Sequence, residues 1–223
     1  MKVVSPFRPF PPESQAHQKL GPFDWVRALK MLRKSVRVSC RCETWALTDV
    51  DTDLPVPAHA FVTTRRRLML WLLEVCGCYL ASPAFDQDTV MISPDMLVVS
   101  DISGWFTGAD LGLMARLGPK HARRPILNGI QFWSLAGRDR LIAFYRQALA
   151  CAEALPDSLI AWGADTEPLI RLLSPLSPGI SERNGMRVAM HDAKALTPVV
   201  WDFKYLRKQR MADVFRHRFG SLA

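Results

Sequence analysis

The sequence has no long hydrophobic run. None of its apolar stretches reaches the roughly 18 residues that a membrane-spanning helix needs. The most apolar one, residues 68–80, is interrupted by Glu74 and Gly77. The first residues contain a lysine but an apolar run of only two valines, so we expect no secretory signal. These features argue against a membrane-spanning or exported protein and predict a cytoplasmic one.

The sequence also lacks the cysteine spacing of a structural zinc site. Its five cysteines include two C-x-C pairs, Cys40 with Cys42 and Cys76 with Cys78, where zinc knuckles use C-x₂-C. The odd count speaks against a disulfide framework. In residues 36–42 every second side chain is apolar or a cysteine, which favours a strand with its cysteines facing a core. We therefore predict reduced thiols.

Repeats, low-complexity tracts and linkers are absent as well. What is present is a chain of 223 residues, 49% hydrophobic and 22% charged, which suits one large core. We therefore expect a single domain over residues 1–223.

The order of predicted elements is typical of α/β proteins. A short strand at residues 2–4 is followed by a proline-rich loop and an amphipathic helix over residues 23–32. A strand over residues 35–47 and a helix over residues 64–80 come next. Strand, loop and helix in this order predict a mostly parallel central sheet flanked by helices.

One acidic residue stands at a break between two strand-like runs. Residues 89–92 and 96–99 are apolar and β-prone, and Ser93 and Pro94 separate them. Asp95 therefore lies at a strand end, where open α/β sheets bind ligands. A carboxylate there suits Mg²⁺ or Mn²⁺ carrying a nucleotide diphosphate, although this segment taken alone is better explained as a simple turn.

The second half adds two further polar positions. Asn128 and Gly129 lie between apolar runs, and this dipeptide favours a hairpin turn. After a predicted helix over residues 138–155, Asp165 follows an aromatic residue and a glycine. Taken alone, Asp165 is better explained as the N-cap of a helix that begins near Pro168.

Positive charge exceeds negative charge, with a formal net charge of +8. The cations cluster at residues 65–67, 123–124, 204–210 and 216–218. One such cluster is usually a solvated helix face, but four together favour polyanionic partners.

The combination of these motifs resembles the GT-A class of nucleotide-sugar glycosyltransferases, in particular small phage-type members. The resemblance covers residues 76–211. It rests on TVMISPDMLVV at residues 89–99, which is similar to the strand-flanked metal motif, and on LNGIQFW at residues 127–133, which is similar to the acceptor-side segment. WGADTEPL at residues 162–169 and DFKYLRKQRM at residues 202–211 complete it. It implies a GT-A-like, Rossmann-like single domain and an enzyme.

The metal motif departs from the usual Asp-x-Asp, because Ser93 takes the first acidic position. The upstream Asp86 and Asp88 spell that pattern but precede the strand, so Asp95 is the expected ligand. The resemblance implies Mn²⁺ or Mg²⁺ at Asp95, with Asp202 in place of the family's late histidine and His191 as a weaker candidate.

The resemblance also implies the remaining roles. Asp165 would bind the sugar, serve as a base or stabilise charge at the anomeric carbon, and Asn128 would lie on the acceptor side. The donor nucleotide, a UDP-sugar in the first instance, would contact the loop after the first strand, the end of the second, a helix start and a basic segment near the C-terminus. These residues are Pro6, Phe7, Arg8, Thr48, Asp49, Arg65, Ser93, Asp95, Lys204, Arg207 and Lys208.

The basic clusters and the phage-like character of the resemblance favour DNA carrying a 5-hydroxymethylpyrimidine as the acceptor. Such an enzyme binds phosphates and extrudes a base, for which Trp105 and Trp133 are candidate wedges, although tryptophans of this kind more often belong to the core. Two alternatives stay open. One is a glycosyltransferase acting on a saccharide or another non-DNA acceptor, and the other is an inactive GT-A-like protein that binds nucleic acid.

Overall fold

The structure is a computed structural model that describes residues 1–9, 24–64, 67–116, 125–156, 166–196, 198–203 and 208–222. Its strands are β1 (Lys2–Pro6), β2 (Thr44–Asp49), β3 (Ala58–Phe61), β4 (Thr89–Ile92), β5 (Met96–Val98), β6 (Leu111–Ala115), β7 (Ile126–Trp133), β8 (Gly179–Arg183), β9 (Met186–Asp192) and β10 (Val200–Asp202). Its helices are α2 (Trp25–Cys40), α3 (Leu68–Ala81), α4 (Arg138–Glu153), α5 (Thr166–Leu173), α6 (Ala193–Leu196) and α7 (Lys208–Phe219), with short 3₁₀ turns at Ser103–Trp105 and Leu135–Gly137.

Eight strands form one central sheet in the order β3-β2-β1-β4-β7-β6-β9-β8. The pairings make six strands point the same way, while β7 and β8 run against them. A separate ribbon pairs β10 with β5 in antiparallel fashion. The predicted α/β fold with a mostly parallel sheet flanked by helices is therefore confirmed.

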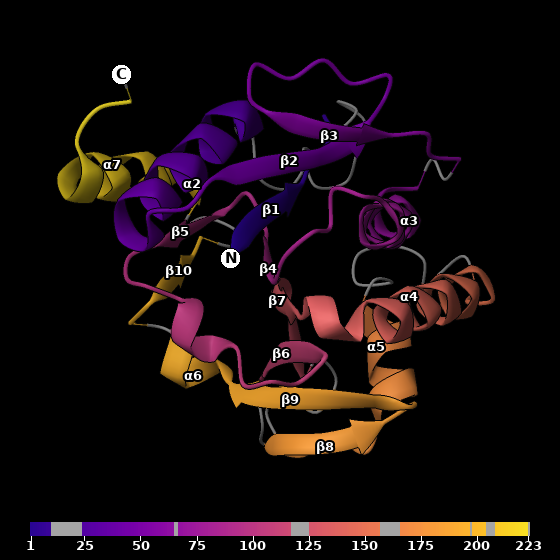
Figure 1. Ribbon diagram of the computed structural model, residues 1–223. Helices are drawn as coiled ribbons and strands as arrows, with labels where there is room; N and C mark the ends of the chain where they lie inside the picture. Colours follow the sequence, from indigo (N-terminus) through magenta and orange to yellow (C-terminus); the bar gives the residue numbers. More distant parts are fainter. Residues whose placement is uncertain are drawn as a thin grey trace.

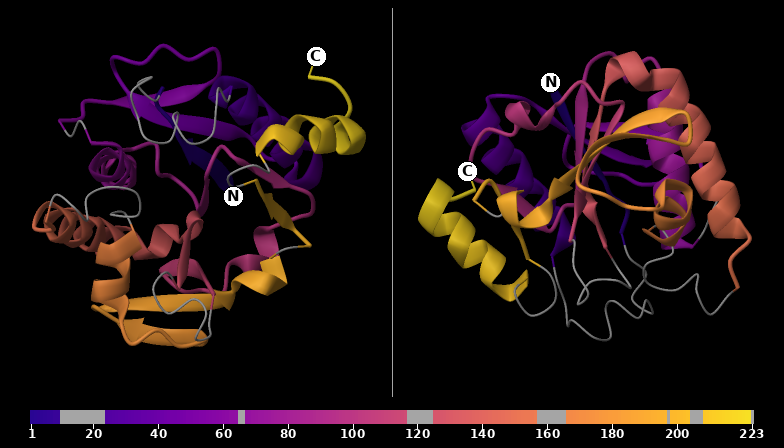
Figure 2. Two further views of the ribbon diagram at one scale, coloured as in Figure 1. Left: turned by 180° about the vertical axis from the view of Figure 1, so that it is seen from behind. Right: turned by 90° about the horizontal axis from the view of Figure 1, so that it is seen from below.

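Helices cover both faces of the sheet (Figures 1 and 2). On one face, α3, α4 and α5 bury a core that includes Trp71, Trp133 and Phe144. On the other, α2 and the β5 strand pack against the sheet, and α7 packs outside them through Met211 and Phe215. Within the described ranges no helix is long and apolar enough to cross a membrane.

Helix α2 is longer than the sequence predicted. The Asp24 side chain caps its start by accepting from the Arg27 backbone N–H at 2.8 Å. Leu29, Leu32 and Val36 then recur every three or four residues and are fully buried, so the helix continues to Cys40. The predicted strand over residues 35–47 is wrong, because alternation over a few residues also occurs on a helix; the strand itself begins at Thr44.

All five cysteines are free thiols, as predicted. Cys76 is buried, and the other four cysteines are partly exposed. Cys40 and Cys42 do not line the core as predicted, because they lie at the end of the longer helix α2 instead of on a strand. A hydrogen bond between these two side chains lowers the pKa of Cys40 and raises the pKa of Cys42.

Candidate active site

The expected donor residues come together at one edge of the sheet. We call it the carboxyl edge, because β1, β2, β4, β6 and β9 all end there. Arg8 follows β1, Asp49 ends β2, and Asp95 follows β4. Asn128 joins them because β7 runs in the opposite direction and therefore begins at this edge. This edge is where open α/β sheets bind ligands.

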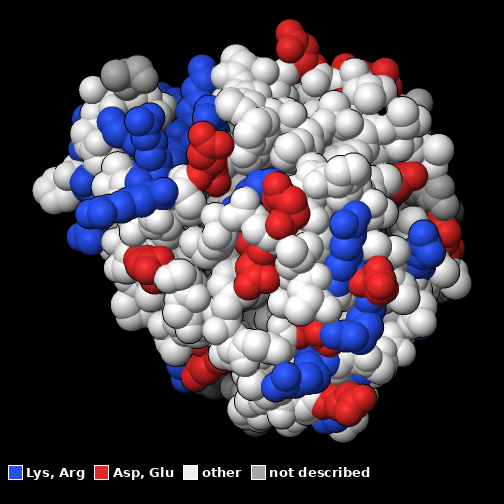
Figure 3. Space-filling view, in the orientation of Figure 1, with Lys and Arg blue, Asp and Glu red and all other residues white. Residues whose placement is uncertain are grey.

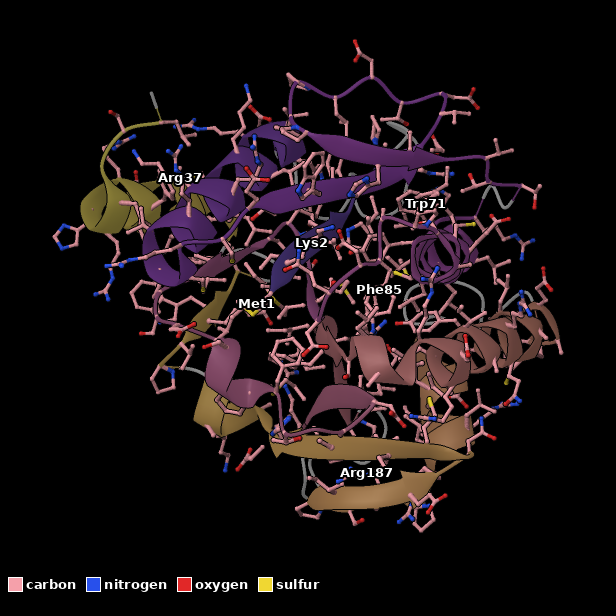
Figure 4. All side chains as sticks on the ribbon, in the orientation of Figure 1. Met1, Lys2, Arg37, Trp71, Phe85 and Arg187 are labelled. Carbon is pink, nitrogen blue, oxygen red and sulfur yellow. The ribbon has the colours of Figure 1, made fainter. Side chains whose placement is uncertain are left out.

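Arg8 and Asp49 form the first part of the site. The Arg8 Nη1 lies 3.9 Å from the Asp49 Oδ2, and the guanidinium stands 5.3 Å from the centre of the Trp71 ring on α3. Asp49 also accepts a hydrogen bond from the Thr52 hydroxyl at 2.6 Å. A largely buried cation over an aromatic ring, next to a fixed carboxylate, is suited to contact the base and ribose hydroxyls of a nucleotide. Figure 4 labels Trp71 beside α3.

Three other expected donor contacts are less direct. Pro6 is the last residue of β1 and pairs with Leu47 in β2. The Phe7 side chain is buried against Leu29, so Phe7 can meet a ligand only through its backbone. Thr48 is also buried, although no described atom accepts from or donates to its hydroxyl.

Ser93 and Asp95 form a tight turn between β4 and β5. The Ser93 hydroxyl donates to the Asp95 Oδ1 at 2.7 Å, and the Ser93 backbone N–H donates to the Gly129 carbonyl at 2.7 Å. Asp95 is 7% exposed. A Cβ on Gly129 would overlap the end of Met96, so glycine lets β7 approach this turn closely. The predicted strand break at residues 93–95 is confirmed.

The alternative Asp-x-Asp pair lies in the loop before β4, as predicted, and therefore at the edge opposite the candidate site. Asp86 forms an ion pair with Lys2 at 2.8 Å, and the Asp88 carboxylate accepts from the Leu135 N–H at 2.8 Å. Both residues precede β4, so they are loop residues rather than part of the site.

Asn128 lies within a strand, so the hairpin turn that its sequence favours does not form. Leu113 pairs with Gln131 and Met114 with Leu127, which makes residues 128–130 bulge out of the pairing with β6. Bulges of this kind re-aim side chains near active sites. The Asn-Gly pair serves the bulge instead of a turn.

A buried hydrogen-bond network fixes which way the Asn128 amide points. The Trp133 indole N–H, which can only donate, bonds to the Gln131 Oε1 at 3.1 Å, and the Tyr145 hydroxyl donates to the same oxygen at 2.5 Å. The Gln131 amide nitrogen must then face the other way, and it donates to the Asn128 Oδ1 at 2.5 Å. Asn128 therefore directs its N–H₂ group away from Gln131.

Asp202 reaches the same region through the β5–β10 ribbon. It pairs with Met96, and the next residue, Phe203, donates its N–H to the Asp95 carbonyl at 3.0 Å. The Asp202 carboxylate lies 3.8 Å from the Arg116 guanidinium, just after β6. Sequence analysis did not single out Arg116, because a lone arginine after an apolar run gives no sign of a partner so distant in the sequence.

The other aromatic and histidine candidates belong to the packing of the sheet. Trp133 is fully buried, so the structure overturns its role as a wedge. The His191 ring packs edge-on against Trp105, with centroids 5.2 Å apart, and against Phe132 at 6.0 Å. Burial lowers the pKa of His191. This histidine is thus enclosed by rings rather than grouped with carboxylates.

Several expected residues lie outside the described part of the chain. They are Arg65, Asp165, Lys204 and Arg207. Lys208 is the first residue of α7, and its side chain is not described. Their expected roles stay predictions.

Exposed cations gather along α2 and α7, on the side that we call the basic side. Within α2 no acidic residue interrupts them, and α7 contains one acidic residue, Asp213. Figure 3 shows the cations concentrated over these two helices, and Figure 4 labels Arg37 among them. The members exposed to solvent are Arg27, Lys30, Arg37, Arg41, Arg210, Arg216 and Arg218.

The sheet order, the antiparallel β7 and the ribbon beside the carboxyl edge define a GT-A-type fold, and solved structures confirm this prediction. A glycosyltransferase involved in glycosylation of the major capsid of PBCV-1 matches with a TM-score of 0.56 and 12% identity, over 96% of this chain and 98% of that one. GlyE of Streptococcus pneumoniae TIGR4 also gives 0.56 at 11% identity, over 98% of this chain and half of its own. The galactosyltransferase LgtC, solved with donor and acceptor sugar analogues, matches with a TM-score of 0.51 and 13% identity, over 99% of this chain and 84% of its own. No protein-family model and no curated sequence matches the chain.

Proposed function

We propose that this protein is a glycosyltransferase that moves a sugar from a nucleoside-diphosphate sugar, a UDP-sugar in the first instance, to a hydroxyl acceptor. The observation that carries the proposal is the gathering of Arg8, Asp49, Asp95 and Asn128 at the carboxyl edge of a GT-A-type sheet. These residues come from four separate strand ends, as a ligand site of this architecture requires.

The chemistry assigns a task to each part of the site. In the reaction the bond from the anomeric carbon to the β-phosphate oxygen breaks, the acceptor oxygen takes its place, and the acceptor proton passes to a base. Arg8 and Asp49 would hold the nucleoside, and the N–H₂ of Asn128 would donate to an oxygen of the sugar or acceptor. Asp165 is the proposed base or sugar-binding carboxylate. Lys204, Arg207 and Lys208 would neutralise the departing diphosphate.

For the acceptor we propose DNA that carries a 5-hydroxymethylpyrimidine. The basic side supports this choice, because a field of lysines and arginines along two neighbouring helices suits a phosphate backbone. The burial of Trp133 removes one proposed wedge, so base extrusion would rely on other groups. A saccharide or protein acceptor would need no such field.

Calorimetric titration with UDP, GDP, CDP, ADP and dTDP tests the donor site. We expect one of these diphosphates to bind the wild-type protein, and Arg8→Ala to weaken it roughly 10- to 100-fold, because a charge-assisted contact and a stacked ring are lost. Arg183→Ala, which removes a partly exposed cation at the end of β8, away from the carboxyl edge, is the matched control and should bind normally. If none of the diphosphates binds, the glycosyltransferase proposal fails.

The acceptor requires a second measurement. With the donor base known, transfer of labelled sugar to hydroxymethylated and to unmodified DNA should differ, and hydroxymethylated DNA alone should be labelled. Transfer to free sugars without any DNA requirement would support the saccharide alternative. Salt-dependent DNA binding without turnover, unchanged by Asp95→Ala, would support the inactive nucleic-acid-binding protein.

A further inference from the structure

In the described part of the chain the predicted metal ligands, Asp95 and Asp202, are not joined by a third acidic, histidine or cysteine side chain. No group of three or more histidine, cysteine, aspartate or glutamate side chains comes together in that part of the chain. The two expected ligands, Asp95 and Asp202, are brought close in the backbone by the hydrogen bond from Phe203 to Asp95. Their carboxylates, however, each face a different partner.

Asp95 is hydrogen-bonded to Ser93, the residue that stands where the usual Asp-x-Asp motif has its first aspartate. Its Oδ1 accepts from the Ser93 hydroxyl at 2.7 Å. In the usual motif that place would hold a second carboxylate, which shares the charge of a divalent cation. A serine hydroxyl brings no charge, so the change removes one of the anionic groups that such an ion needs.

Asp202 already faces a cation. Its carboxylate lies 3.8 Å from the Arg116 guanidinium, and the two side chains are 19% and 40% exposed. Arg116 is anchored directly at the end of β6, where its backbone N–H donates to the Pro125 carbonyl at 2.6 Å. A metal ion at Asp202 would compete with this guanidinium for the same carboxylate and would be repelled by it.

We propose that the Arg116 guanidinium, oriented by Asp202, supplies the positive charge that a divalent metal supplies at this position in the usual GT-A motif. The inference rests on the glycosyltransferase function proposed above. It assigns Arg116 to the diphosphate of the donor, with Asp202 as a positioning residue.

The chemistry of the step suits an arginine. When the bond between the anomeric carbon and the β-phosphate oxygen breaks, both of its electrons stay on that oxygen, so negative charge grows on the diphosphate. A guanidinium is always charged and presents several N–H donors in a plane that matches phosphate oxygens. The ion pair with Asp202 also draws the guanidinium toward the carboxyl edge before the donor binds.

Titration of the protein in EDTA and in excess Mn²⁺ with the same panel of nucleoside diphosphates tests the inference. We expect the wild-type protein to bind its diphosphate equally in both. R116Q should weaken binding roughly 10- to 100-fold in both conditions, since a charged hydrogen-bonding group is lost. R116K should fall between the two. R187Q removes an exposed arginine near the start of β9, away from the carboxyl edge, and should bind as the wild type does (Figure 4).

The variant D202N distinguishes most clearly between Asp202 as a metal ligand and Asp202 as the residue that positions Arg116. If Asp202 is a metal ligand, this variant abolishes Mn²⁺-dependent binding. If Asp202 orients Arg116, the variant keeps most of the binding seen in EDTA, because the arginine remains. D202N and R116K also carry the test if thermal melting shows that R116Q does not fold.

The outcomes are distinct. Binding that requires Mn²⁺ and is unchanged in R116Q would overturn the inference and leave the proposed glycosyltransferase function standing. Failure of the wild-type protein to bind any diphosphate in either condition would refute the proposed function, and the role of Arg116 with it. Metal-independent binding that R116Q weakens would support both.

Discussion

Replacing Gln131 by leucine is expected to lower the free energy of unfolding by about 2–5 kcal/mol and the rate of sugar transfer roughly 10- to 100-fold. Gln131 is 2% exposed and bonds to three side chains. Leucine would remove the oxygen that accepts from the buried Trp133 N–H and from the Tyr145 hydroxyl, which accounts for the loss of stability. It would also release the Asn128 amide, which accounts for the loss of rate. Urea unfolding and donor turnover measure the two effects.

A double variant distinguishes these two effects. Adding Tyr145→Phe to Gln131→Leu removes one of the two donors that bonded to Gln131, and replacing both partners of a hydrogen bond by apolar groups is nearly neutral. We therefore expect the double variant to recover about 1–2 kcal/mol of stability compared with additivity. Its turnover should stay as low as that of Gln131→Leu, because Asn128 is still unsupported. Recovery of turnover along with stability would show that Asn128 needs no orientation by this network.

The strands near the candidate site could be predicted because each is short, apolar and ended by a strong signal. Ser93 and Pro94 stop β4, and the structure places the break between β4 and β5 there. The start of β1 and the helices α3, α4 and α5 were predicted within a few residues of their observed bounds. Hydrophobic periodicity over a whole element made these predictions sound.

Predictions from local sequence patterns were wrong where one pattern is compatible with two kinds of secondary structure. Val36, Val38 and Cys40 alternate as in a strand, yet α2 continues through them and leaves Val38 59% exposed. Asn128 and Gly129 favour a turn, but the approach of β7 to the Ser93 turn uses the glycine for close packing instead. In both cases tertiary packing decided between two local possibilities.

The charges of the site could be predicted only where a motif marks them. Asp95 was found from its strand end, and Asp202 from a resemblance. Arg116 and Gln131 act through partners that are distant in the sequence or through an amide orientation, and a single sequence shows neither. The carboxyl edge is thus predictable as a place, while the partner of each carboxylate is not.

Asp110→Ala is expected to destabilise the protein by about 2–4 kcal/mol, with little effect on donor binding. Asp110 is 5% exposed and precedes β6 at the edge opposite the candidate site. Its carboxylate accepts two hydrogen bonds from Arg140 on α4, at 2.7 and 2.8 Å, and one from the Arg187 N–H at 2.9 Å. It therefore ties α4 and β9 to β6. Because Arg140 is half exposed and stays solvated, the loss is smaller than for a fully buried pair.

The same carboxylate predicts how stability depends on pH. The hydrogen bonds from Arg140, followed by the Arg187 N–H, hold the pKa of Asp110 below its ordinary value, despite the opposing effect of burial. A group whose pKa is lower in the folded state contributes its stability above its unfolded pKa of about 3.9 and loses it as the pH falls through the folded pKa. Urea unfolding from pH 7 downward should therefore show a steeper acid loss in the wild-type protein than in Asp110→Asn. Asp86→Asn is the control, because Asp86 is an exposed ion-pair partner at the same edge. It should not remove the difference in acid sensitivity that separates proteins with Asp110 from those with Asn at that position. Equal acid sensitivity of the wild type and Asp110→Asn would show that the Asp110 cluster does not contribute to stability as an ionised group.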